Sequence, residues 1–258
     1  MRYLIAAVLL LNIAQPNKAQ VEVTSNILSR VFLVKYGVNQ GTGFTIEVQD
    51  RQYLITARHL VKGMKNGDNV DILQLGGWKQ FAVKPLFPTP EEVDIAVLVL
   101  DVQISPAYPL EATSENLSVS QPMYFLGFPF GIGIDSRKIN NGYPFPLVKK
   151  GICSAIVPSS TNDYMLIILD GMNNPGFSGA PIVFVDQTTR ALKVAAVVSG
   201  YRNQEYVVKR KITEKGKEDR FTDTDMVIQG NSGIVTGFNI KSAVDIILKN
   251  PIGPQVKK

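Results

Sequence analysis

Three side chains in this sequence are of the types that cooperate in nucleophilic catalysis: His59, Asp94 and Ser178. Ser178 lies in the run 174–181 (NPGFSGAP), where the flanking glycines predict a tight turn with converging backbone N–H groups. His59 is the only histidine of the chain. A serine hydroxyl is a poor nucleophile unless an imidazole accepts its proton, and the imidazole needs a carboxylate that holds it in one tautomer. This chemistry predicts that Ser178 attacks, His59 transfers the proton and Asp94 orients His59.

The same turn carries the predicted oxyanion site. Attack on a carbonyl produces a negatively charged oxygen that needs fixed donors, and losing one donor can cost about 10²–10³ in rate. The backbone N–H groups of Gly176 and Ser178 are the candidates, because glycine adopts positive φ readily and leaves room for a substrate carbonyl. Taken singly, each of the three residues also has a structural explanation: a half-buried histidine, a turn serine and an aspartate that caps the start of a strand.

The composition narrows the class of protein. Of the 258 residues, 45% are hydrophobic and 19% charged, which is typical of a globular chain. One cysteine, Cys153, excludes a disulfide within the chain, and with a single histidine no zinc site of His and Cys ligands can form. Cys153 lies in an apolar run and is expected to be a buried, inert thiol. The net charge of +5 is scattered and does not indicate nucleic-acid binding. We expect no metal and no cofactor.

The amino terminus is typical of a secretory signal. Residues 1–3 (MRY) carry a basic side chain, residues 4–11 are apolar, and small residues follow. The apolar stretch is well short of the ~20 residues that cross a bilayer. We therefore predict a signal peptide over residues 1–19, cleaved after Ala14 or Ala19, and no stable membrane insertion afterwards. A buried amino-terminal helix is the alternative. Export without disulfides favours a secreted or periplasmic bacterial protein.

Short β-branched and aromatic runs, broken by Gly, Pro or Asn, predict an all-β fold. In the first half the predicted strands are residues 31–34, 42–48, 53–56, 70–75, 78–83 and 95–100. Gly76 and Gly77 predict a two-residue hairpin turn between two of them. After a looser connection, the second half has predicted strands at residues 123–126, 151–157, 165–169, 181–185 and 192–198.

The remaining segments complete the predicted organisation. Residues 127–133 are glycine-rich but lack a phosphate-binding motif, so we interpret them as a barrel loop. Residues 202–226 mix basic and acidic side chains and predict a solvated loop or a protruding hairpin. Residues 240–248 have apolar residues at helical spacing. Together these elements predict two packed six-stranded β-barrels with a short carboxy-terminal helix.

In this arrangement the chain resembles the chymotrypsin-fold serine peptidases, most closely the bacterial trypsin-like branch of the HtrA-type proteases. The resemblance covers about residues 27–249. It rests on the serine run and on residues 41–44 (GTGF), 56–59 (TARH), 94–98 (DIAVL), 126–131 (LGFPFG) and 233–238 (GIVTGF). It implies a first barrel over about residues 27–105, a second over about 120–240, and a final helix over about 240–249.

Three departures from the family pattern stand out. Phe177 precedes the serine, where trypsins have Asp and the HtrA branch usually has Asn. The trypsin Asp pairs with a newly cut amino terminus, so we expect no zymogen switch of that kind. Ala180 replaces the second glycine after the serine. No sequence for a PDZ domain follows within the 258 residues, so peptide-gated assembly is not expected.

The resemblance also implies where a substrate side chain would bind. The pocket floor falls at Met172 with Asn173 beside it, and the wall falls on Ser199, Gly200 and Tyr201. No acidic residue lies at the floor, and a buried Lys or Arg without a partner carries a desolvation cost. We expect a small or medium apolar side chain to be preferred before the cut bond.

Two functions from different classes fit the sequence. The first is an exported serine endopeptidase that acts on polypeptides through an acyl-enzyme on Ser178. The second is an inactive module that keeps the protease fold and uses its cleft to hold peptides or protein partners. The three catalytic residue types favour the enzyme, whereas Phe177 is the feature that favours the inactive module. The oligomeric state and the physiological substrate are not indicated by the sequence.

Overall fold

The structure, a computed structural model, describes residues 23–136, 139–213 and 218–257. The predicted signal peptide lies outside the described residues. The first barrel is preceded by a single helical turn, α1 (Ser25–Leu28), and contains a short 3₁₀ turn, η1 (Arg58–Val61). Its strands are β1 (Val31–Tyr36), β2 (Asn39–Val48), β3 (Arg51–Thr56), β4 (Asn69–Gln74), β5 (Gly77–Leu86) and β6 (Ala96–Leu100). They close in the order β1-β2-β3-β6-β5-β4.

The second half forms a sheet that also closes. Its strands are β7 (Glu111–Ala112), β8 (Pro122–Gly127), β9 (Leu147–Pro158), β10 (Met165–Asp170), β11 (Pro181–Val185), β12 (Leu192–Ile212) and β13 (Arg220–Asn239). The sheet order is β11-β8-β9-β10-β13-β12-β7, and an additional β11–β12 pairing joins its ends. Six strands therefore make a ring, to which β7 of the connection adds in parallel. A 3₁₀ turn, η2 (Pro129–Gly131), follows β8, and the helix α2 (Lys241–Lys249) follows β13.

The two predicted barrels and the carboxy-terminal helix are confirmed. The apolar run that starts at Ile95 is buried throughout β6, as expected for a barrel strand. One hydrophobic core continues from the first barrel through Phe128 and Val183 of the second to Ile247 of α2. Because this core spans both barrels, they pack as one body and hold a fixed surface between them. No helix among the described residues is long and apolar enough to span a membrane.

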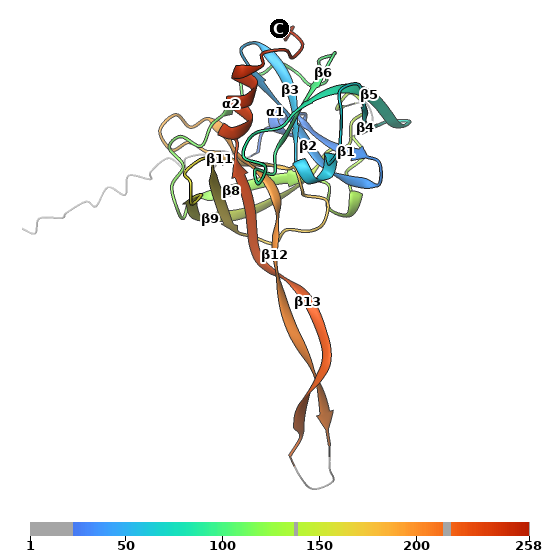
Figure 1. The fold of residues 1–258 in the computed structure, drawn as a ribbon, viewed down its shortest axis with the longest axis vertical. Helices are drawn as coiled ribbons and strands as arrows, with labels where there is room; N and C mark the ends of the chain where they lie inside the picture. The colour runs from blue at the N-terminus through green and yellow to red at the C-terminus, as the bar shows by residue number, and fades with distance from the viewer. Residues whose placement is uncertain (1–22, 137–138, 214–217, 258) are drawn as a thin grey trace, which may run out of the picture.

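Two local predictions needed correction. The turn between β4 and β5 is formed by Leu75 and Gly76, because Gly77 already pairs with Gln74. The strand predicted to end at residue 198 continues as β12 to Ile212, and β13 returns from Arg220. The charged segment is thus the protruding hairpin of the two predicted alternatives, and it stands away from both barrels as a twisted ribbon (Figure 1). The ion pair Lys209–Asp223 (3.3 Å) joins its strands, and Lys211 of β12 pairs with Asp219 (2.5 Å), which directly precedes β13.

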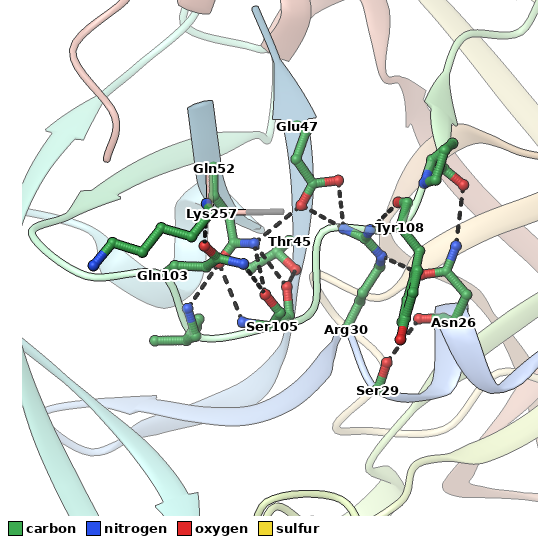
Figure 2. Close-up of polar contacts among 12 residues, drawn as sticks. Asn26, Ser29, Arg30, Thr45, Glu47, Gln52, Gln103, Ser105, Tyr108 and Lys257 are labelled. Carbon is green, nitrogen blue, oxygen red and sulfur yellow. Dashed lines mark hydrogen bonds and ion pairs between the residues drawn. The ribbon is translucent and has the colours of Figure 1, made fainter. Parts of the chain in front are cut away.

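A buried polar network fastens the start of the connection to the first barrel (Figure 2). The Arg30 side chain is fully buried, and its Nη1 lies 2.6 Å from both carboxylate oxygens of Glu47. The same guanidinium donates to the backbone oxygen of Tyr108. Gln52 donates to Glu47 (3.0 Å) and to the Ser105 hydroxyl (2.9 Å). A buried charge that keeps its partner is tolerated, whereas a buried charge without one is costly.

We predict that Arg30→Met lowers the free energy of unfolding by about 3 kcal/mol, because Glu47 would keep its charge without a cation. Chemical denaturation with urea would measure the loss. Lys35→Met is the control, since Lys35 and Asp71 are 3.7 Å apart and both partly exposed, and such pairs contribute at most about 1 kcal/mol. Equal effects of the two substitutions would contradict the prediction.

Candidate active site

His59 and Asp94 come from two loops of the first barrel that meet at its rim. His59 lies in η1, directly after β3, and Asp94 lies just before β6. Arg58 holds these loops together, because it donates to the Pro88 oxygen (3.2 Å) and to the Glu91 carboxylate (2.9 Å). The His59 imidazole and the Asp94 carboxylate are thereby brought face to face.

The Asp94 carboxylate accepts hydrogen bonds from both barrels. The backbone N–H of His59 donates to Oδ1 at 2.8 Å, and His59 Nδ1 lies 2.7 Å from Oδ2. The Ser199 hydroxyl, from β12 of the second barrel, donates to Oδ2 at 2.6 Å. An ionised carboxylate only accepts, so Nδ1 carries the imidazole proton and Nε2 is left as an acceptor. The Asp94 carboxylate is 17% exposed, whereas the His59 side chain is 47% exposed.

Ser178 reaches the same cluster through Ser199. Its hydroxyl donates to the backbone oxygen of Ser199 at 3.2 Å. Ser199 thus contacts Asp94 with its hydroxyl and Ser178 with its carbonyl. The structure therefore pairs His59 with Asp94 and links Ser178 to that pair through Ser199, while no hydrogen bond joins Ser178 to His59 among the described residues.

Thr42 of β2 fixes the serine turn to the first barrel. Its backbone N–H donates to the backbone carbonyl oxygen of Ser178 (2.8 Å), and its hydroxyl donates to the backbone carbonyl oxygen of Gly176 (2.7 Å). The hydroxyl also accepts the Phe128 N–H at 3.2 Å. On the other side, the Gly179 N–H donates to the Val198 oxygen of β12 at 2.7 Å. The turn is held from both barrels, so its backbone position is closely specified.

Gly176 has the conformation that the sequence predicted for it. Its φ is +104°, and a Cβ at this position would overlap the Phe128 carbonyl oxygen. The preceding carbonyl, that of Pro175, accepts the Phe130 N–H at 2.7 Å. With the Pro175 and Gly176 carbonyls both bonded to neighbouring segments, neither carbonyl is free to turn toward an oxyanion at Ser178.

Phe177 is a packing residue under the serine turn. Its side chain is fully buried and meets the Phe125 ring edge-on, with centroids 5.1 Å apart. The Lys149 ammonium of β9 lies 5.5 Å from the Phe177 ring centroid. Lys149 also donates to the Met172 oxygen at 2.6 Å and to the Asn174 side-chain oxygen. Partial burial lowers the Lys149 pKa. Aromatic packing and one lysine therefore order the loop that precedes the serine.

The predicted pocket residues lie on two adjacent segments. Met172 is 54% exposed and follows β10, whose end is tied to β13 by the Gly171 N–H bond to the Gly233 oxygen (2.8 Å). Asn173 is buried, and its side-chain oxygen accepts the Asn174 N–H at 2.8 Å. Ser199, Gly200 and Tyr201 are partly exposed on β12. The Asn173 side chain is thus committed to its own loop rather than turned outward.

Two contacts at the site were missed by the sequence analysis. Ser199 was assigned to the pocket wall, and its hydroxyl bond to Asp94 was not expected. Lys149 was not singled out either, because it precedes the strand predicted at residues 151–157 and the sequence gives no signal of its partners. Cys153, in contrast, is buried as predicted, and burial raises its pKa, which disfavours the reactive thiolate.

Two barrels with a serine turn between them define a chymotrypsin-fold serine peptidase. A family model described as a trypsin-like peptidase domain matches residues 41–192, more than half of the chain. The chain belongs to this family. No curated protein sequence matches it.

Solved structures with the same fold include HtrA-type proteases. Two structures of the HtrA-type protease AlgW with a tripeptide, one of them a serine-to-alanine variant, are 20% identical to this chain, with a TM-score of 0.56. The match covers 87% of this chain and 61% of AlgW, so the chain spans less than two thirds of that protein. The inactive form of a serine-to-alanine mutant of Rv3671c from M. tuberculosis is 17% identical, with a TM-score of 0.51 and coverage of 88% and 91%. At these identities the likeness establishes the fold.

Proposed function

We propose that this protein is a serine endopeptidase that hydrolyses peptide bonds through an acyl-enzyme. The observation that carries the proposal is the hydrogen-bonded cluster in which Asp94 orients the only histidine and, through Ser199, meets the serine of the glycine-flanked turn. Nucleophile, base and orienting carboxylate are the parts that peptide hydrolysis by serine requires. Export stays a prediction from the sequence of residues 1–19.

The proposed reaction has two stages, formation of an acyl-enzyme and its hydrolysis, and each catalytic group acts in both. The Ser178 hydroxyl turns from the Ser199 oxygen to His59 Nε2, which takes its proton as Oγ attacks the scissile carbonyl. The N–H groups of Gly176 and Ser178 stabilise the oxyanion. The tetrahedral intermediate expels the amine, which receives the proton from Nε2, and leaves an acyl-enzyme. A water molecule then attacks in the same way and releases the acid and the free serine.

The order of the serine loop supports the enzyme over a binding module. An inactive binding module was the alternative function because Phe177 occupies the position where related enzymes use a polar residue. Phe177 is instead packed against Phe125 beneath the turn, and the Lys149 ammonium bonds to the backbone ahead of it. Because the Pro175 carbonyl is held by Phe130, it does not compete for the proposed oxyanion site. Phe177 is therefore compatible with catalysis.

We predict that a fluorophosphonate probe labels Ser178 and that Ser178→Ala abolishes both labelling and casein cleavage without loss of folding. His59→Ala should cause a comparable loss, since residues that act as a unit have non-additive effects. Peptide mapping of the labelled protein and a thermal melt of each variant are the measurements. Casein cleavage by Ser178→Ala at the wild-type rate would contradict the assignment.

We predict that Lys149→Met lowers kcat by about tenfold and slows fluorophosphonate labelling to a similar degree. Hydrogen bonds to charged groups contribute roughly 1.5–3 kcal/mol, and the Met172 and Asn174 oxygens would lose their common donor. Lys150→Met is a matched control, because the Lys150 ammonium lies over the Tyr124 ring, 5.8 Å from its centroid. Unchanged labelling of Lys149→Met, or equal losses in both variants, would contradict a positioning role for Lys149.

We propose that the pocket formed by Met172 and residues 199–201 takes a small or medium apolar side chain. The pocket floor has no acidic residue that could pair with a substrate Lys or Arg. The Lys149 ammonium, which donates to the Met172 carbonyl, also repels a positively charged side chain there. A cleavage profile on a mixed peptide library should show Val, Ala or Leu before the cut bond. Predominant cleavage after Arg, Lys or Glu would contradict this preference.

A further inference from the structure

The hairpin arm, which we define as residues 202–212 of β12 and 220–231 of β13, has one edge that begins at the candidate active site. β12 pairs with β11 only up to Val197, and beyond that its only partner among the described strands is β13. The first residues of the open edge are Ser199 and its neighbours, and the Ser199 carbonyl lies 3.2 Å from the Ser178 hydroxyl. The ribbon then runs outward from the body (Figure 1).

The register of β12 shows which backbone groups this edge presents. Peptide groups of alternate residues face opposite edges of a strand. The carbonyls of Arg202 and Val208 face β13, because they accept the hydroxyls of Ser232 (2.7 Å) and Thr224 (2.6 Å). The Ser199 carbonyl faces the other way, toward Ser178. The register of β12 shifts between Val198 and Gly200, so the assignment rests on Arg202 and Val208, and residues 203, 205 and 207 between them direct their N–H and C=O groups to the open edge.

An unpaired edge of this length is a template for another strand. Its charged side chains are of both signs, and Lys209 pairs with Asp223 across the two strands, so charge alone does not identify the partner. Apolar side chains are exposed on the arm, among them Tyr206 (50%), Val207 (50%), Val227 (51%) and Ile228 (60%). Tyr206 pairs with Ile228 and Val207 with Val227, so each face of the ribbon has an apolar patch.

We propose that the open edge of β12 binds the substrate as an added antiparallel strand far beyond the pocket, so that the enzyme prefers long, extended polypeptide segments. This inference rests on the proposed peptidase function. A strand antiparallel to β12 that begins at Ser199 runs with its amino-terminal residues outward along the arm. In such a strand each pair of main-chain hydrogen bonds spans two substrate residues. The apolar patch at Tyr206 and Val207 therefore lies opposite substrate residues about six to nine positions before the cut.

The continuity of the edge with Ser178 favours a substrate over a second copy of the chain. A strand paired at Ser199 is already aligned with the outer edge of β12, so each further pair of residues adds main-chain bonds without a new binding site. The expected partner is an unfolded segment with apolar residues on the amino-terminal side of the cut. Most strands of a folded protein are already paired on both edges and cannot add to this one.

The test compares peptides of different length and two proline variants. A casein segment in which a Leu follows apolar residues is synthesised with about 4, 8 or 12 residues up to that Leu, and kcat/KM is measured for each. Glu205→Pro removes an N–H from the open edge of β12. Gln229→Pro is the matched control: Gln229 lies opposite Glu205, so its N–H faces the outer edge of β13. Both substitutions remove the same side-chain bond between Glu205 and Gln229 (3.2 Å).

We expect the wild-type kcat/KM to rise at least tenfold from the shortest to the longest peptide. Glu205→Pro should remove most of this rise, and Gln229→Pro should retain it. Binding of fluorescent forms of the peptides to Ser178→Ala, measured by anisotropy with and without Glu205→Pro, separates this inference from the proposed function. Length-dependent binding that Glu205→Pro weakens would support the edge even if no peptide were cleaved.

Several results would overturn the inference. Affinity that does not depend on peptide length is one, and equal effects of the two proline variants is another. Sedimentation of the wild type would report pairing of arms between two copies. A dimer that Glu205→Pro dissociates, together with length-independent peptide binding, would assign the edge to self-association instead.

Discussion

The candidate site depends on hydrogen bonds that cross from one barrel to the other. Asp94 accepts from His59 of its own barrel and from Ser199 of the second, and Thr42 holds the serine turn from the opposite side. Each of these bonds has a buried or half-buried partner, so losing one leaves a polar group unpaired, at a cost of roughly 1–3 kcal/mol. The shared core between the barrels keeps the two halves of the site in register.

This constraint explains how a phenylalanine can occupy the position before the serine. In trypsins an aspartate there is held by a new amino terminus, which couples order in the loop to cleavage of a precursor. Here Phe177 contributes burial, and Lys149 of β9 supplies the positive charge from within the folded barrel. A group that belongs to a strand is in place as soon as the barrel forms, which agrees with the prediction that the loop needs no processing step.

Much of the fold could be predicted from the sequence, because barrel strands leave a local signature of β-branched runs and turns. Residues 41–44, 56–59 and 94–98 also predicted which segments meet at the site. The Lys149 contacts could not be predicted in this way, since they join residues 23 and 25 positions apart with no periodic pattern. The length of β12 was missed for another reason: in the arm, cross-strand ion pairs replace the apolar alternation by which strands are recognised.

The arm is also where the usual rule for exposed strands is broken. A two-stranded ribbon is marginally stable on its own, and proteins normally shorten or cover such edges. This ribbon continues two barrel strands, so its base is anchored by β10, β11 and β13 pairings inside the core. Its ion pairs and backbone ladder stabilise it further out without covering its outer edge. An edge whose strand is already paired on its other side can add a further strand with little reordering of its own, because the fold has already fixed its backbone.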